Sequence, residues 1–182
     1  MSLRKPSISI RDADFTFENT SVRVTALRSS PKIELEGLST GPFEEGNEYE
    51  VRYWIARELE KAGIARFREE PLDAVKLYKI QWTERIQSVG QLSSLPEDFY
   101  PRLRRLLAEL KDSSGRSPES MREYERVQGF SQDIVNCRLR KIISLASAPG
   151  KKNQIIRSLT VEERDLYEEL SGIIDDWKSE IL

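Results

Sequence analysis

The sequence predicts an α+β protein in which a small N-terminal β-rich domain is followed by an all-α helix-bundle domain with one long central helix. Two observations predict this class: apolar residues alternate with a period of two early in the chain, and they recur at helical spacing from Leu72 onward. A third is a helical run of about 30 residues, against a usual length of about 11 or 12. The predicted domains are residues 1–70 and 71–182, and they meet at Glu69-Glu70-Pro71.

Strands and turns dominate the predicted N-terminal domain. Residues 8–36 alternate in polarity and predict a hairpin, with residues 15–17 on its first strand and residues 22–24 on its second. Residues 33–35 predict a third strand. Residues 37–47, rich in turn-forming residues, predict a long loop.

A short helix and a closing strand complete this domain. The helix is predicted at residues 54–61 with Gly63 as its C-cap, and residues 64–68 alternate again. Trp54 begins the helix directly after a strand and is interpreted as the plug of the domain core. A domain of about 70 residues is near the lower end of independently stable size, and we expect it to be a separable docking piece.

Two amphipathic helices open the predicted helical domain. The first spans residues 72–89, and Trp82 on its apolar face is expected in the core. That face consists of Leu72, Val75, Tyr78 or Lys79, Trp82, Ile86 and Val89. The second helix carries Leu103, Leu106, Leu107 and Leu110, after Pro96 and Pro101 at or near its first turn. Residues 111–118 are interpreted as a polar linker.

The long helix organises this domain. Ser117 is its expected N-cap with Pro118 at the first helical position, and Pro149-Gly150 ends the run. Its main stripe consists of Met121, Tyr124, Val127, Ser131, Ile134, Arg138, Ile142 and Leu145. Further apolar residues lie off this stripe, at Phe130, Val135, Leu139 and Ile143. Three shorter helices cannot cover so much apolar surface, so part of it is expected to face another chain.

A subunit interface is therefore predicted on the long helix. The predicted interface residues are Tyr124, Val127, Ile134, Arg138, Leu139 and Ile142. Arg138 interrupts the apolar stripe, and two interpretations remain open. Either its guanidinium is desolvated and paired with a partner's carboxylate, or its stem packs while its charged head reaches water.

A last helix is predicted after the long one. Thr160 and Glu163 form a capping box that starts it. It carries Leu166, Leu170, Ile173, Ile174 and Trp177.

Composition excludes several classes of function. Lys and Arg total 29 and Asp and Glu total 31, so the net charge of -2 gives no general attraction for nucleic acid. The sequence has no histidine and a single cysteine, Cys137. The usual zinc sites and the usual catalytic arrangements around a nucleophile are therefore excluded. The sequence has no phosphate-binding glycine loop and no metal-spaced carboxylate cluster, so we expect no enzyme activity, cofactor or metal site. Without a run of about 18 apolar residues, the chain is expected to be intracellular.

The candidate DNA contacts are Arg102, Arg105, Lys151 and Lys152. Acidic neighbours such as Glu97 and Asp98 weaken the field around them, so the prediction is weak or no direct DNA binding. The alternative function is a DNA-binding transcriptional regulator with a winged-type β module. Such a regulator would need a basic recognition helix.

Several short stretches resemble subunits of the GINS complex. The first is residues 41–56, which contain a turn, an acidic-glycine pair and the start of a helix centred on a tryptophan. The others are residues 95–100 (Leu-Pro-Glu-Asp-Phe-Tyr), Glu125-Arg126, and residues 137–142 (Cys-Arg-Leu-Arg-Lys-Ile). The resemblance covers residues 31–170 and depends on the order of these stretches. Because the β part comes first, the chain resembles an archaeal subunit of the second-and-third type.

This resemblance implies a non-catalytic scaffold and activator of the replicative MCM helicase, acting in the initiation and fork progression of DNA replication. It implies a heterotetramer with a second GINS subunit type, and contacts with MCM and a RecJ-like or Cdc-type partner in the CMG helicase of the replisome. Primase and polymerase are further candidate partners. The resemblance also implies a nucleoid-associated, cytoplasmic location without membrane contact, and no nucleotide site.

Overall fold

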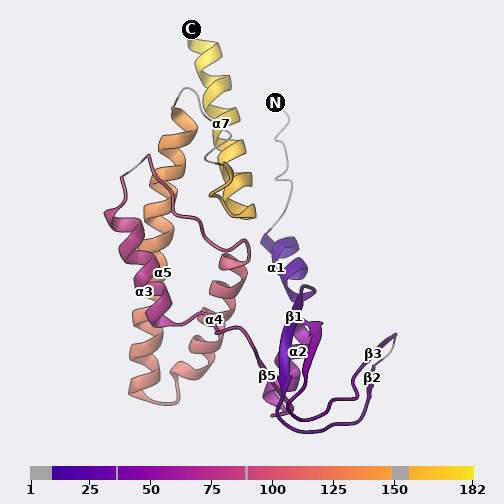
Figure 1. The fold of residues 1–182 in the computed structure, drawn as a ribbon. Coiled ribbons are helices and arrows are strands. Elements are labelled where there is room, and N and C mark those ends of the chain that lie inside the picture. The colour runs from indigo at the N-terminus through magenta and orange to yellow at the C-terminus, as the bar shows by residue number, and fades with distance from the viewer. Residues whose placement is uncertain (1–9, 36, 89, 149–155) are drawn as a thin grey trace. The chain divides into compact units, whose positions relative to one another are not determined.

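The computed structural model describes residues 10–35, 37–88, 90–148 and 156–182, and its fold is α+β as predicted (Figure 1). A small strand-containing N-terminal region is followed by a bundle of helices with a long central member. The chain separates into two compact units: Asp14–Pro71 forms the strand-containing N-terminal unit, and Leu72–Leu182, with residues 10–13 of the described chain, forms the helical unit.

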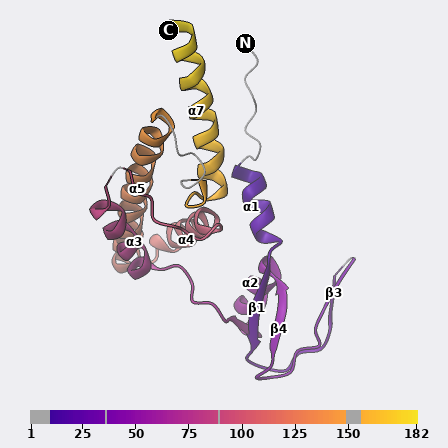
Figure 2. The ribbon, with the colours of Figure 1, turned by 45° about the horizontal axis from the view of Figure 1, so that its top comes forward.

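A three-stranded antiparallel sheet forms the centre of the N-terminal unit. Strand β1 (Ser21–Ala26) lies between β4 (Glu48–Arg52) and β5 (Ala65–Phe67), and β1 and β4 are labelled in Figure 2. Val24 lies opposite Tyr49 on one side and Phe67 on the other. The predicted strands at residues 22–24 and 64–68 are confirmed.

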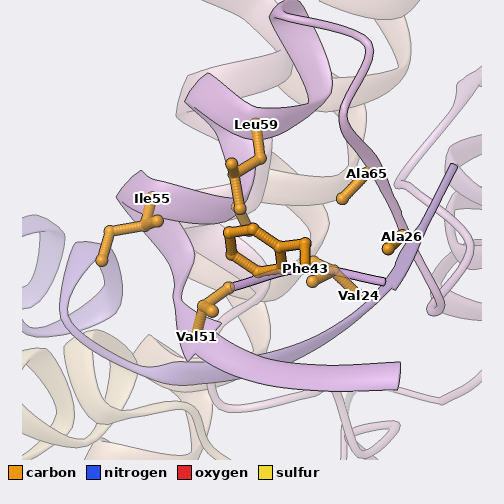
Figure 3. Packing of buried hydrophobic residues seen from close by; sticks show 8 residues of the cluster. Val24, Ala26, Phe43, Val51, Ile55, Leu59 and Ala65 are labelled. Carbon is orange, nitrogen blue, oxygen red and sulfur yellow. The ribbon is translucent and has the colours of Figure 1, made fainter. Parts of the chain in front are cut away.

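Helix α2 (Tyr53–Lys61) packs on this sheet and closes the core of the unit. Figure 3 shows the ring of Phe43 among side chains from β1, β4, β5 and α2. Phe43 is 1% exposed, and Trp54 lies partly buried against the same cluster. The central place predicted for Trp54 is therefore held by Phe43, which reaches the core from a loop. A Cβ on Gly41 would approach that ring to 3.1 Å, and the φ of +88° at Gly41 also favours glycine.

The end of α2 shows how the chain turns back into β5. Gly63 has a φ of 65° and follows the capping residue Ala62. The amide of Ile64 donates to the carbonyl of Leu59 at 2.9 Å, and the amide of Gly63 donates to the carbonyl of Glu60 at 2.9 Å. This pair of bonds is a Schellman motif, in which glycine adopts the left-handed conformation.

The predicted first strand of the hairpin is wrong, because Ile10–Glu18 forms helix α1. Phe17 is 4% exposed and its ring lies 4.3 Å from that of Tyr53, whereas Phe15 is 72% exposed. Residues two apart point to nearly opposite sides of a helix but to the same side of a strand. Two alternating phenylalanines were too short a pattern to distinguish these cases.

The loop predicted at residues 37–47 contains a further strand. Strand β2 (Ile33–Leu35), which was predicted, pairs antiparallel with β3 (Leu38–Thr40), which was not. The three residues of β3 are too few to show an alternating pattern among glycines and polar residues.

Four helices make up the described part of the helical unit: α3 (Ala74–Ile86), α4 (Phe99–Ser114), α5 (Pro118–Ser147) and α7 (Val161–Ile181). Helices α3, α4 and α7 each pack against α5 (Figure 1). Helix α5 has the predicted 30-residue length, and the hydroxyl of Ser117 accepts a hydrogen bond from the amide of Ser120 at 3.1 Å. Pro149-Gly150 lies outside the described residues.

The predicted stripe of α5 is the buried face of that helix. Val127, Ser131, Ile134, Arg138 and Ile142 are buried, whereas Met121 at the first turns is exposed. Three of the residues expected off the stripe, Val135, Leu139 and Ile143, are exposed as well. Helix α4 extends through Ser114, so the connection to α5 is shorter than the polar linker predicted at 111–118.

The predicted apolar face of α3 is wrong for the residues within that helix, although Leu72 before it packs partly buried against the core, and Val89 lies outside the described residues. Trp82 is 57% exposed, and Val75, Tyr78 and Ile86 are exposed with it. The buried residues of α3 are instead Leu77, Gln81 and Glu84, on the opposite side of the helix. Two of these three are polar, which hides the inward face from any search for apolar periodicity.

Helix α7 begins at the predicted capping box. The amide of Glu163 donates to the hydroxyl oxygen of Thr160 at 3.3 Å, and the amide of Thr160 donates to Oε2 of Glu163 at 3.1 Å. Its inward face is made by Glu163, Tyr167 and Ser171. Among the residues that the prediction singled out, Ile173 and Trp177 are exposed, and Leu170 and Ile174 are partly buried. None of the described helices combines the length and apolar character needed to cross a membrane.

We predict that limited proteolysis cuts the chain between its two units. Residues 68–73 contain neither helix nor strand, and each unit has its own hydrophobic core. A glutamate-specific protease should cleave after Glu69 or Glu70 and leave two resistant fragments, as measured by mass spectrometry. Glu60 in helix α2 is the internal control and should stay uncut, whereas equal resistance at all three positions would indicate a single fused domain.

Candidate functional site

A buried arginine lies at the middle of α5. Ile134 and Ile142 stand one turn before and after Arg138 on the inward stripe, so the helix itself carries the guanidinium into the bundle. The Arg138 side chain is 0% exposed. A charge removed from water at this depth requires full pairing inside the protein.

Two carboxylates pair with Arg138. Its Nη1 donates to Oε1 of Glu84 on α3 at 2.6 Å, and its Nη2 donates to Oε2 of Glu163 on α7 at 2.6 Å. Its Nε also donates to Oε1 of Glu163, so that contact is the two-point fork for which guanidinium geometry is suited.

Two backbone carbonyls complete the pairing. Nη1 donates to the carbonyl of Ser93 at 3.0 Å, and Nη2 donates to the carbonyl of Ser158 at 3.3 Å. An arginine has five N–H groups, and these contacts account for all five. Arg138 therefore joins two helices and two connecting segments to α5.

Glu84 is held by a second cation. Nζ of Lys141 donates to its Oε2 at 2.7 Å, and the hydroxyl of Ser93 donates to its Oε1. Burial alone would raise the pKa of Glu84, but the hydrogen bonds from Lys141 and Ser93 and the charge of Arg138 outweigh it and lower that pKa. Glu84 is therefore ionised throughout the neutral range.

Glu163 has two roles at once. It closes the capping box of α7 with Thr160, and it accepts the hydroxyl hydrogen of Tyr100 at 2.6 Å while it holds Arg138. Burial, followed by the charge of Glu163, raises the pKa of Tyr100, which therefore remains a neutral donor. Together Arg138, Lys141, Glu84 and Glu163 form a charge-balanced group, which we call the Arg138 network.

A second polar link joins α3 to α5 beside this network. Nε2 of Gln81 donates to Oδ2 of Asp133 at 2.5 Å, and Nη2 of Arg85 donates to the same oxygen at 2.6 Å. The polar residues of α3 thus have partners on α5, which explains why its polar side faces inward.

The comparisons with known proteins agree with this helical arrangement. A family model, Sld5, described as the GINS complex protein helical bundle domain, matches residues 69–182. This chain belongs to the GINS family. A comparison with curated proteins gave no match.

The GINS family model spans the whole Arg138 network, from α3 to α7. Of the two interpretations left open for Arg138, the structure shows the paired guanidinium, with both carboxylates in the same chain. Val127, Ile134 and Ile142 are likewise buried within this chain. Tyr124 is partly exposed and Leu139 is 37% exposed. Contact of these six residues with another subunit stays a prediction.

Two of the four candidate DNA contacts, Arg102 and Arg105, are described by the structure, and both lie on α4. Nε of Arg102 pairs with Asp98 at 2.6 Å on the first turns of α4, and Arg105 lies partly exposed on the same helix. Lys151 and Lys152 lie outside the described residues. DNA contact by this set stays a prediction.

Sequence reasoning missed Glu84, Lys141 and Tyr100 as members of the site. One signal pointed to Glu84: it stands seven residues after Leu77, two turns along the same side of α3. Glu163 was recognised, but only as a helix cap. Nothing local in the sequence indicates that this cap also pairs with an arginine 25 residues away.

We predict that Arg138→Ala destabilises the helical unit by about 3–5 kcal/mol, because it leaves Glu84 and Glu163 buried without their main partner. Arg138→Lys should recover only part of this loss, since an ammonium cannot reproduce the two-point contact with Glu163. Arg140→Ala, at an exposed position of the same helix, should cost less than about 1 kcal/mol. Urea unfolding of the three variants measures these differences, and equal stabilities would contradict a structural role for the network.

We also predict that acid weakens the helical unit through Glu84. The pKa of folded Glu84 lies below its ordinary value of 4.5, so this carboxylate contributes stability above about pH 4.5 that is lost as pH falls through the folded pKa. Stability measured from pH 7 to pH 3 should therefore decline more steeply in the natural protein than in Glu84→Gln.

Glu109→Gln is the matched control for this measurement, because Glu109 is an exposed glutamate on α4. The stability of Glu109→Gln should decline between pH 7 and pH 3 as steeply as that of the natural chain. If Glu84→Gln also followed the natural curve, the ion pairs of Glu84 would have no part in acid unfolding.

Proposed function

We propose that this GINS-family chain is a non-catalytic subunit of the GINS complex that scaffolds and activates the replicative MCM helicase. The observation that supports this most directly is the match of the GINS helical-bundle model to residues 69–182. Membership of the family places the chain in the GINS complex and in DNA replication. The scaffold role toward MCM is the finer part of the proposal.

The Arg138 network supports a scaffold in preference to an enzyme. Its charged side chains are between 0% and 5% exposed, so they do not reach a substrate in solvent. Their hydrogen bonds are made to one another and to neighbouring segments, which fixes helix positions. Such a preorganised bundle can bind a partner without ordering itself first.

The order of the units supports the proposed subunit type. The strand-containing unit precedes the helical one, as in the second-and-third-type GINS subunits that the sequence resembles. We propose that this is an archaeal subunit of that type, in a tetramer with a second GINS subunit type. MCM and a RecJ-like or Cdc-type protein are the proposed partners, in a nucleoid-associated, cytoplasmic setting.

We predict that the purified full chain forms a stable complex with a co-expressed second GINS subunit, and that this complex stimulates DNA unwinding by MCM. Light scattering measures the mass of the complex, and a fluorescent forked duplex reports unwinding. The chain alone is the control and should neither unwind DNA nor shift the mobility of a duplex. A chain that ignored the second subunit yet bound duplex DNA would favour the alternative regulator.

A further inference from the structure

Strand β4 forms an open edge of the three-stranded sheet. The order of strands is β4-β1-β5, so β4 has a neighbour on one side only, and the β2–β3 pair is a separate sheet (Figure 2). Within the part of the chain that the structure describes, no strand pairs with the outer side of β4. We call this outer side the β4 edge.

The other edge of the sheet, formed by β5, is protected. Strand β5 has only three residues, helix α2 packs against it, and the chain continues from it into Glu69-Glu70-Pro71. Short strands, covering helices and prolines are devices by which proteins keep an edge from pairing with another chain. Strand β4 has five residues and contains neither proline nor glycine. Of the two edges of this sheet, the β4 edge is therefore the one that remains available.

The pairing with β1 shows which backbone groups of β4 point outward. The amide of Ala26 donates to the carbonyl of Asn47 at 2.9 Å, so the odd-numbered residues of this stretch direct their backbone groups toward β1. Bonded and non-bonded residues alternate along an antiparallel pair. Glu48 and Glu50 therefore direct their amides and carbonyls away from β1, toward the open side.

The side chains of β4 alternate between two environments. Tyr49 and Val51 face the core of the unit, and Figure 3 shows Val51 among the core side chains. Glu48, Glu50 and Arg52 are exposed on the opposite face of the sheet. A strand added to the β4 edge would continue both faces, with apolar residues on the core side and charged residues on the solvent side.

The solvent side of the β4 edge carries three charges in a fixed order. Glu48 pairs with Arg68 at 2.6 Å, and both side chains are about half exposed. Arg52 donates to the side-chain oxygen of Asn19 at 3.3 Å, and Glu50 lies between Glu48 and Arg52 along the strand. Opposite charges across two strands are favourable. This edge therefore favours a strand with basic residues opposite the two glutamates and an acidic residue opposite the arginine.

We propose that the β4 edge binds an extended segment of a different protein as an added antiparallel strand. Along its own chain direction, this segment carries an acidic, an apolar, a basic, an apolar and a basic residue. These lie opposite Arg52, Val51, Glu50, Tyr49 and Glu48 in that order. Its two basic residues exchange backbone hydrogen bonds with Glu50 and Glu48. In this mode of binding the main-chain bonds give affinity, and the alternating side chains give specificity.

A second copy of this chain fits the β4 edge less well. In an antiparallel pair of two β4 strands that sets Glu48 opposite Arg52, the two copies of Glu50 lie directly opposite each other. Like charges at such a position are destabilising. The charges of β4 therefore disfavour self-pairing while they favour the segment described above.

The first test measures amide hydrogen exchange of the full chain with the synthetic peptide Thr-Glu-Val-Lys-Val-Arg-Thr. In the free chain the amides of Glu48 and Glu50 should exchange rapidly. Saturating peptide should slow their exchange by about tenfold or more, because each amide gains a hydrogen-bond acceptor. Tyr49 and Val51 are the internal control, since their amides bond to β1 and should exchange slowly with or without the peptide.

The second test changes the backbone of the peptide. Methylation of its lysine amide removes a donor that points toward β4, and it should weaken binding by about tenfold, as measured by fluorescence anisotropy. Methylation of the valine amide next to that lysine is the matched control. That amide points away from β4, so its methylation should leave the affinity unchanged.

The third test exchanges charges across the contact. Glu50→Lys should weaken binding of the peptide several-fold, and it should strengthen binding of a second peptide that has glutamate in place of the lysine. Glu60→Lys makes the same change of charge at an exposed position on α2 and is the control. It should leave the affinity for both peptides unchanged.

Four results would overturn the proposal. They are amides of Glu48 and Glu50 that are already protected in the free chain, exchange that saturating peptide leaves unchanged, equal binding of the lysine-methylated peptide, and a dimer formed through β4. The inference goes beyond the proposed function and does not rest on it. Any of these results would leave the scaffold role of the chain intact, whereas failure to bind a second GINS subunit would remove that role and leave the β4 edge as proposed.

Discussion

The complete burial of Arg138 is the constraint on which the helical unit depends. A guanidinium without access to water needs an acceptor for every N–H group, and those acceptors come from α3, α7 and the segments that contain Ser93 and Ser158. The long helix could pack against its neighbours in several rotations on apolar contacts alone. The directional bonds of one side chain select a single arrangement of them.

The same constraint decides which side of α3 faces solvent. Glu84 must turn inward to pair with Arg138, and Gln81 turns inward with it to meet Asp133. Since α3 is a rigid rod, Trp82 and its apolar neighbours are then carried to the outside. A buried polar contact thereby creates an exposed apolar surface, which reverses the usual arrangement of an amphipathic helix.

The sequence predicted best where local rules act alone. The serine and proline that start α5, its buried stripe and the capping box of α7 all follow from neighbours within one or two turns. Helix α1 was missed because two phenylalanines do not define a period. The inward side of α3 was missed because its polarity makes sense only beside Arg138, 54 residues later in the chain. For the site, the arginine and its need for a partner were predictable, but the identity of its partners required the tertiary fold.

The double role of Glu163 has a consequence for the order of events as the bundle forms. A helix cap normally stabilises its own first turn whether or not the helix has docked. Here the capping carboxylate of Glu163 also accepts hydrogen bonds from the guanidinium of Arg138. One side chain therefore both starts α7 and attaches it to α5. Fraying of that first turn would release the buried arginine. Opening of the helix end and undocking of the helix therefore become one cooperative step, and the capped amides of Thr160 and Glu163 should exchange with solvent as slowly as those of the core.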